Sequence, residues 1–109
     1  MVNTDLYTYR VHWSKDDDAF IATAAELPSL SWIADTPREA LDGMLTLVRE
    51  VASEMAASGE TPPTPIATRE FSGRFLVRVP PETHRELALA AAEQHVSLNR
   101  LAATRLVSA

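Results

Sequence analysis

Two arginines near the C-terminal end of the chain are placed like side chains that read the edges of bases. In the stretch GRFLVRVPPE, residues 73–82, side-chain character alternates, so a strand would place Arg74, Leu76 and Arg78 on one face. The opposite face would be apolar: Phe75, Val77 and Val79. Arginine binds guanine through two parallel hydrogen bonds, and a two-stranded ribbon fits the major groove of DNA. The pattern predicts DNA binding, with a charged strand face that only confers solubility as the plainer alternative.

Two helices are expected after this strand. Pro80 has no N–H and ends strand pairing, whereas Pro81 suits the first turn of a helix over about residues 81–94. His95 tolerates positive φ, and Ser97 is a good N-cap for a second helix. The apolar stripes are Leu87, Ala88 and Ala91 in the first helix and Leu98, Leu101, Ala102 and Leu106 in the second. The N–H groups at the start of the second helix are a predicted phosphate site.

This strand-helix-helix unit is too small to fold alone. Only 37 residues run from Gly73 to Ala109, which is too few to bury an adequate core. A lone strand must also find a partner for its backbone groups. We therefore predict a homodimer in which two chains pair their strands antiparallel and interlock their helices. Whether such dimers assemble further into tetramers is left open.

Charge and proline content divide the chain into two parts. Residues 1–66 carry a net charge of −7, and residues 67–109 carry +2. The proline-rich segment at residues 60–65 cannot continue a helix and limits strand pairing. We expect an N-terminal domain over residues 1–67, a linker over 68–72 and a C-terminal DNA-binding module over 73–109.

The N-terminal part has the pattern of a small α+β domain. Apolar residues alternate over residues 7–13 and again over 19–27, with an acidic turn between them, and this predicts a hairpin. A third strand is expected near residues 31–34. Thr36, Pro37 and Glu39 form the start signal of a helix whose apolar stripe continues to Met55. The expected order is β-β-β-α, with a short last strand near residues 65–67 as an option.

Several side chains in this domain admit a functional and a structural interpretation. Asp16, Asp17 and Asp18 could bind a cation, but they lack the spacing of metal loops, so a solvated hairpin tip is favoured. His12 has no catalytic partner in this half and is interpreted as a surface residue. Trp13 is assigned to the core, because it alternates with Tyr9 and Val11. The sequence leaves the role of Trp32 open.

Composition excludes several classes of protein. The chain has 109 residues and no cysteine, which removes disulfide, thiolate-metal and thiol redox chemistry. Its length argues against a large catalytic domain. No apolar run approaches the roughly 20 residues that span a bilayer, and the first residues lack a signal-peptide pattern. We expect a cytoplasmic protein that is not an enzyme, uses no cofactor or metal, and does not bind a membrane.

The order and spacing of these motifs resemble a known family. Residues 74–99 resemble the ribbon-helix-helix domain of Arc- and CopG-type repressors, and the whole chain resembles the HicB family of antitoxins. The segments that carry the resemblance are YTYRVHW (7–13), ELPSL (26–30), DTPREAL (35–41), SGRFLVRVPPETH (72–84) and VSLN (96–99).

The resemblance implies an N-terminal domain with a partial ribonuclease-H-like fold that binds a small basic HicA-type ribonuclease toxin. It also implies a C-terminal module that represses the protein's own operon by binding operator DNA. The implied base-reading residues are Arg74, Leu76 and Arg78, and the implied phosphate-anchoring turn is Ser97, Leu98 and Asn99. Two positions depart from the family pattern. Leu76 replaces a polar base reader and His95 replaces a frequent glycine.

The leading functional hypothesis is an antitoxin that masks a toxin and represses transcription as a dimer. A stand-alone ribbon-helix-helix regulator without a toxin partner is the alternative. An RNA-processing enzyme is the weakest reading, because no spaced acidic set could hold two metal ions.

Overall fold

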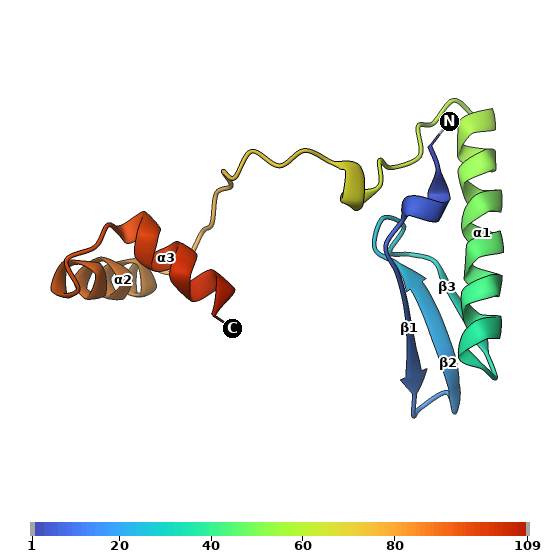
Figure 1. Cartoon of the computed structure of the whole chain (residues 1–109), viewed down its shortest axis with the longest axis horizontal. Helices are drawn as coiled ribbons and strands as arrows, with labels where there is room; N and C mark the ends of the chain where they lie inside the picture. The colour runs from blue at the N-terminus through green and yellow to red at the C-terminus, as the bar shows by residue number, and fades with distance from the viewer. Residues whose placement is uncertain (1, 109) are drawn as a thin grey trace. The chain divides into compact units, whose positions relative to one another are not determined.

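The chain folds into two compact units, Met1–Phe71 and Ser72–Ala109. A computed structural model describes residues 2–108 (Figure 1). The architecture is mixed α and β, with a three-stranded antiparallel sheet followed by helices, as expected from the sequence.

The sheet of the N-terminal unit has the strand order β1-β2-β3. A short 3-10 helix, η1 (Thr4–Leu6), precedes β1 (Tyr9–Ser14), which pairs with β2 (Ala19–Ala24); β2 pairs in turn with β3 (Ser31–Ala34). The acidic turn between β1 and β2 is closed by Asp18 in the left-handed region, with φ 50°. Asp17 accepts a hydrogen bond of 2.9 Å from the Ser14 hydroxyl. The predicted hairpin with an acidic tip is confirmed.

Helix α1 (Pro37–Ala57) begins at the predicted start signal. The Thr36 hydroxyl accepts a hydrogen bond of 3.1 Å from the N–H of Glu39, and Pro37 occupies the first turn. The chain leaves the helix through Gly59, whose φ of 87° is one that glycine adopts without strain. The start signal in the sequence is confirmed at Thr36, and the positive φ of Gly59 marks the end of the helical segment.

The core lies between α1 and one face of the sheet (Figure 1). Ala22 and Ala24 on the central strand are almost fully buried, and their small side chains let the helix approach closely. The helix contributes its own stripe of fully buried residues: Ala40, Met44, Val48 and Ala52. Trp32 lies across the helix at Gly43, where a Cβ atom would overlap the indole ring.

The prediction for Trp13 is wrong. Tyr7 is buried, and Tyr9 and Val11 pack against the core, but Trp13 is 50% exposed. Trp13 belongs to the end of β1, the edge strand that α1 contacts least. Its ring instead meets Phe20 edge to face, with centroids 5.0 Å apart.

The optional strand near residues 65–67 is replaced by a 3-10 turn, η2 (Ile66–Thr68). Pro62, Pro63 and Pro65 have no N–H to offer to a neighbouring strand. The N–H of Ile66 is used differently, because it donates to the Glu26 carboxylate at 3.0 Å. The segment is therefore fixed by side-chain hydrogen bonds and not by a strand ladder.

The C-terminal unit contains the two expected helices, α2 (Pro81–Glu93) and α3 (Leu98–Val107). His95 between them adopts φ 58°, the positive value anticipated for this position. Residues 74–80 form no strand within the single chain. In the single chain the apolar residues of this segment, which were predicted to pack in a dimer, are exposed: Phe75, Val77 and Val79. A strand requires a hydrogen-bonded neighbour, and one chain supplies none here.

Among the helices in residues 2–108, none combines the length and apolar character needed to cross a bilayer.

Candidate nucleic-acid interface

The segment that precedes α2 exposes the three predicted base-reading side chains. Leu76 is 81% exposed, and Arg74 and Arg78 are also exposed. The Ser72 hydroxyl accepts a hydrogen bond of 3.1 Å from the N–H of Arg74 and donates one of 3.3 Å to its carbonyl. Gly73 takes φ 80°, which favours glycine. Thus the start of the segment is a defined turn, and its arginines are free to contact a ligand.

The turn between α2 and α3 contains the three predicted phosphate-anchoring residues, Ser97, Leu98 and Asn99. The Ser97 hydroxyl accepts a hydrogen bond of 3.0 Å from the N–H of Arg100, so Ser97 is the N-cap that the sequence predicts. The N–H groups of Leu98 and Asn99 belong to the first turn, where the helix supplies no acceptor. The first turn of a helix is the positive end of its dipole, and phosphates commonly bind N–H groups at such a position.

The single chain does not bring these two groups of residues together. Arg74, Leu76 and Arg78 precede the start of α2, whereas Ser97, Leu98 and Asn99 follow its end. A helix of 13 residues spans about 20 Å, and α2 separates the two groups (Figure 1). One continuous interface would therefore need residues from a second chain.

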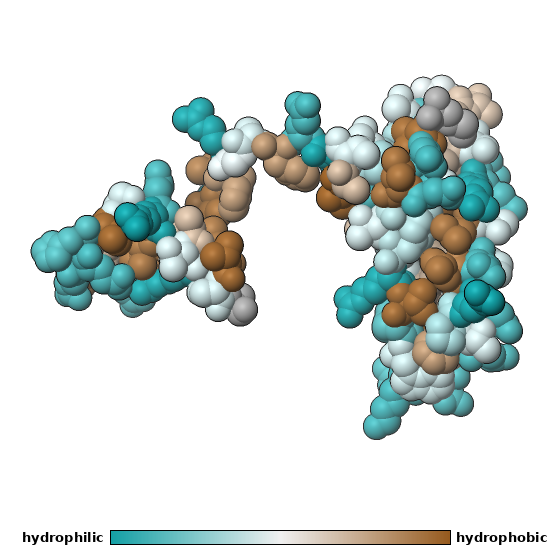
Figure 2. Space-filling model, in the orientation of Figure 1, coloured by the Kyte–Doolittle hydropathy of each residue, from teal (hydrophilic) through white to brown (hydrophobic). Residues whose placement is uncertain are grey.

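The C-terminal unit buries few of its apolar side chains. Ala91 and Leu101 are the only buried hydrophobic residues in the described part of this unit. Figure 2 shows apolar surface on the segment that enters α2 and beside the two helices. The exposed large hydrophobic residues are Phe75, Leu76, Val77, Val79, Leu89, Leu106 and Val107. The single chain therefore leaves most of the large apolar side chains of this unit in contact with water.

The charge of this unit suits an anionic ligand. Residues 72–109 contain five arginines and three glutamates, a net charge of +2, while the whole chain carries −5. Attraction to phosphates must therefore be local, at the arginine segment and at the start of α3.

Sequence reasoning missed a buried carboxylate in the N-terminal unit. Glu26 is only 7% exposed and accepts hydrogen bonds from the N–H groups of Thr8 and Ile66, at 2.9 and 3.0 Å. Burial raises the pKa of Glu26, but these hydrogen bonds outweigh it, and the net pKa is lowered. The Tyr7 hydroxyl forms a further hydrogen bond to the proline-rich segment, because it donates to the carbonyl of Pro63 at 2.7 Å. Together these contacts hold the proline-rich segment against the sheet.

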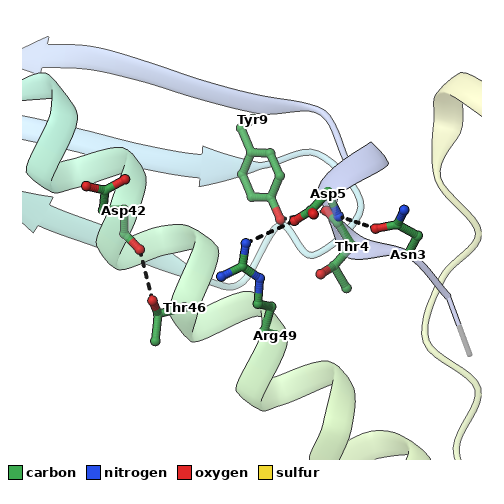
Figure 3. A network of polar contacts seen from close by, with 7 residues as sticks. All are labelled: Asn3, Thr4, Asp5, Tyr9, Asp42, Thr46 and Arg49. Atoms are coloured by element: carbon green, nitrogen blue, oxygen red, sulfur yellow. Dashed lines mark hydrogen bonds and ion pairs between the residues drawn. The ribbon is translucent and has the colours of Figure 1, made fainter.

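A second polar network joins α1 to the N-terminal residues (Figure 3). Arg49 pairs with Asp5 at 3.1 Å, and both side chains are more than half exposed, so the pair contributes little to stability. The Tyr9 hydroxyl donates to the carbonyl of Thr4 at 2.8 Å. Within residues 2–108 no group of three or more His, Asp or Glu side chains could hold a metal ion.

Comparison with known proteins gives one family match. A family model described as the HicB family matches residues 57–106, nearly half of the chain. The matched region begins at the end of α1 and includes the proline-rich segment, α2 and most of α3. No curated protein and no solved structure matches the chain. The match supports the interpretation of this chain as a HicB-like antitoxin.

Proposed function

We propose that the chain is a HicB-type antitoxin that binds a HicA-type ribonuclease toxin and represses its own operon as a homodimer. The observation that carries this proposal is the family match over residues 57–106. On this proposal the chain is not an enzyme and acts by binding alone.

The dimer is supported by the incomplete core of the C-terminal unit. When two chains pair residues 74–79 as an antiparallel ribbon, the backbone groups of this segment gain partners. One face of the ribbon then covers the helices with the apolar side chains that a single chain exposes: Phe75, Val77 and Val79. The C-terminal unit is then a ribbon-helix-helix module.

The opposite face of the ribbon reads operator DNA. Arg74 and Arg78 contact base edges in the major groove, and Leu76 contacts an apolar group such as a thymine methyl. The start of α3, capped by Ser97, binds a backbone phosphate and fixes the register of the module on the duplex. Two copies supply two symmetric half-sites.

The N-terminal unit binds the toxin. Its net charge of −7 over residues 1–66 is complementary to a small basic ribonuclease and repels nucleic acid. The hydrogen bonds of Glu26 and Tyr7 hold the proline-rich segment to this unit, so the connection to the C-terminal unit begins at a fixed point.

The proposal is tested with the purified chain and DNA from upstream of its own gene. Light scattering should give a dimer or a multiple of it, and fluorescence anisotropy should show saturable binding that a scrambled duplex does not reproduce. The small basic protein encoded beside the gene should co-purify with the chain. DNA binding without toxin binding would describe a stand-alone regulator, and absence of both would refute the proposal.

A further inference from the structure

A shallow groove with an aromatic floor lies on the N-terminal unit, along the flank of α1 that faces β3. Its volume is about 330 Å³, and its floor is formed by the Trp32 indole, Gly43 and Leu47. The helix residues Asp42, Thr46 and Glu50 complete the lining. Trp32 remains 42% exposed, so one part of the ring packs on the helix while another part is open to solvent.

The two carboxylates on the lip of this groove, Asp42 and Glu50, have no hydrogen-bond or ion-pair partner among residues 2–108. Asp42, Thr46 and Glu50 follow each other at four-residue spacing and so lie on the same side of α1. The Thr46 hydroxyl donates to the backbone carbonyl of Asp42 at 3.1 Å, which leaves the Asp42 carboxylate free (Figure 3). Within residues 2–108 the single ion pair joins Arg49 to Asp5, and Arg38, one turn before Asp42, forms no ion pair with either lip carboxylate.

An indole face beside unpaired carboxylates selects a cation. A cation over a tryptophan ring is attracted by the ring quadrupole, and arginine also stacks its planar guanidinium on the ring. The same guanidinium can form two parallel hydrogen bonds with one carboxylate. Nucleic acid is excluded from this surface, because the lip and the unit as a whole are negatively charged.

We infer that this groove is the docking site for an arginine side chain of the toxin. The inference rests on the proposed function, which supplies a basic protein partner, and adds the surface and the chemistry of contact. The guanidinium stacks on Trp32 and pairs with Asp42 or Glu50. The two lip carboxylates lie about 12 Å apart along the helix, so the other one is available to a second basic side chain.

The test is a titration of the full chain with the HicA-type toxin encoded beside its gene, followed by calorimetry. The Asp42→Asn/Glu50→Gln variant removes both lip charges and should bind the toxin at least about tenfold more weakly. The matched control is Asp16→Asn/Asp18→Asn, which removes the same charge at the exposed hairpin tip, where asparagine tolerates the backbone of residue 18. This control should bind within about twofold of the unaltered chain.

A second measurement follows Trp32 directly. A Trp13→Phe chain keeps an aromatic ring against Phe20 and leaves Trp32 as the only tryptophan. Its fluorescence should change on saturation with toxin. If the unaltered chain binds toxin but the lip variant binds equally well, or Trp32 emission stays constant, the groove is not the docking site and the proposed function stands. If the unaltered chain does not bind toxin, both the groove assignment and the toxin-binding function are overturned.

Discussion

Replacing Gly43 with alanine should destabilise the N-terminal unit, although alanine is the better helix former. In an exposed helix interior this change gains about 1 kcal/mol. At Gly43 the added Cβ would overlap Nε1, Cδ1 and Cε2 of Trp32, so the indole must leave the helix. Trp32 is 42% exposed, so more than half of its surface is covered. Displacing the indole exposes part of this covered surface to water, which costs free energy of folding. Exposing about 100 Å² of that surface costs about 2.5 kcal/mol, which leaves a net loss of about 1.5 kcal/mol.

A double-mutant cycle separates the gain in helix propensity at residue 43 from the loss of Trp32 packing. Urea unfolding followed by far-UV circular dichroism gives the free energy of unfolding for Gly43→Ala, Trp32→Ala and the double variant. In the Trp32→Ala background the overlap is gone, so Gly43→Ala should stabilise by about 1 kcal/mol. The coupling energy should be about 2.5 kcal/mol. Stabilisation of the unaltered chain by Gly43→Ala would refute the packing of the indole on the helix.

Three further predictions concern the arginine segment, the α3 cap and the buried carboxylate. Arg78→Ala should weaken operator binding by about 1–3 kcal/mol and relax specificity at one base pair, whereas thermal stability should not change; equal affinity in a gel-shift titration would contradict this. Ser97→Ala removes the cap and should cost about 0.5–2 kcal/mol of stability. It should also lower affinity for all DNA sequences alike, and a loss confined to one operator variant would count against a phosphate contact. Glu26→Gln should destabilise by about 1–3 kcal/mol at pH 7, measured by urea unfolding. Because the folded pKa of Glu26 is lowered, its contribution is complete above the unfolded pKa of about 4.3 and disappears as pH falls through the folded value. The difference between Glu26→Gln and the unaltered chain should therefore shrink below about pH 4, and a constant difference would refute the ionised carboxylate.

Helix starts were predictable because their signals are local. Thr36 and Ser97 each accept a hydrogen bond from an N–H three residues away, so a short stretch of sequence determines the cap. The alternation of the first hairpin is also local, and so is the need for positive φ at His95.

Long-range contacts were not predictable in the same way. Glu26 binds the N–H of Ile66, 40 residues away, and no pattern around Glu26 indicates this partner. Trp32 could not be assigned because its environment depends on Gly43, a residue on another element. Trp13 has the correct alternation for burial, yet the path of α1 over the sheet leaves it half exposed.

The arginine segment, residues 74–79, could not be predicted from the sequence pattern of one chain for a different reason. The alternation from Arg74 to Val79 predicts a strand, but a strand forms only with a neighbour, and the single chain has none at this place. The predicted base-reading and phosphate-binding residues remain candidates for the same reason, since one chain holds them at opposite ends of α2. In the proposed dimer, a second chain would supply the residues that one chain cannot bring together.

The central claim is tested most directly by RNA cleavage. The HicA-type toxin encoded beside the gene is incubated with RNA and increasing amounts of the purified chain, and the rate of cleavage is measured. A HicB-type antitoxin should reduce cleavage in proportion to its concentration and abolish it at a fixed molar ratio of the two proteins. Cleavage that continues at the same rate in excess of the chain would contradict the assignment.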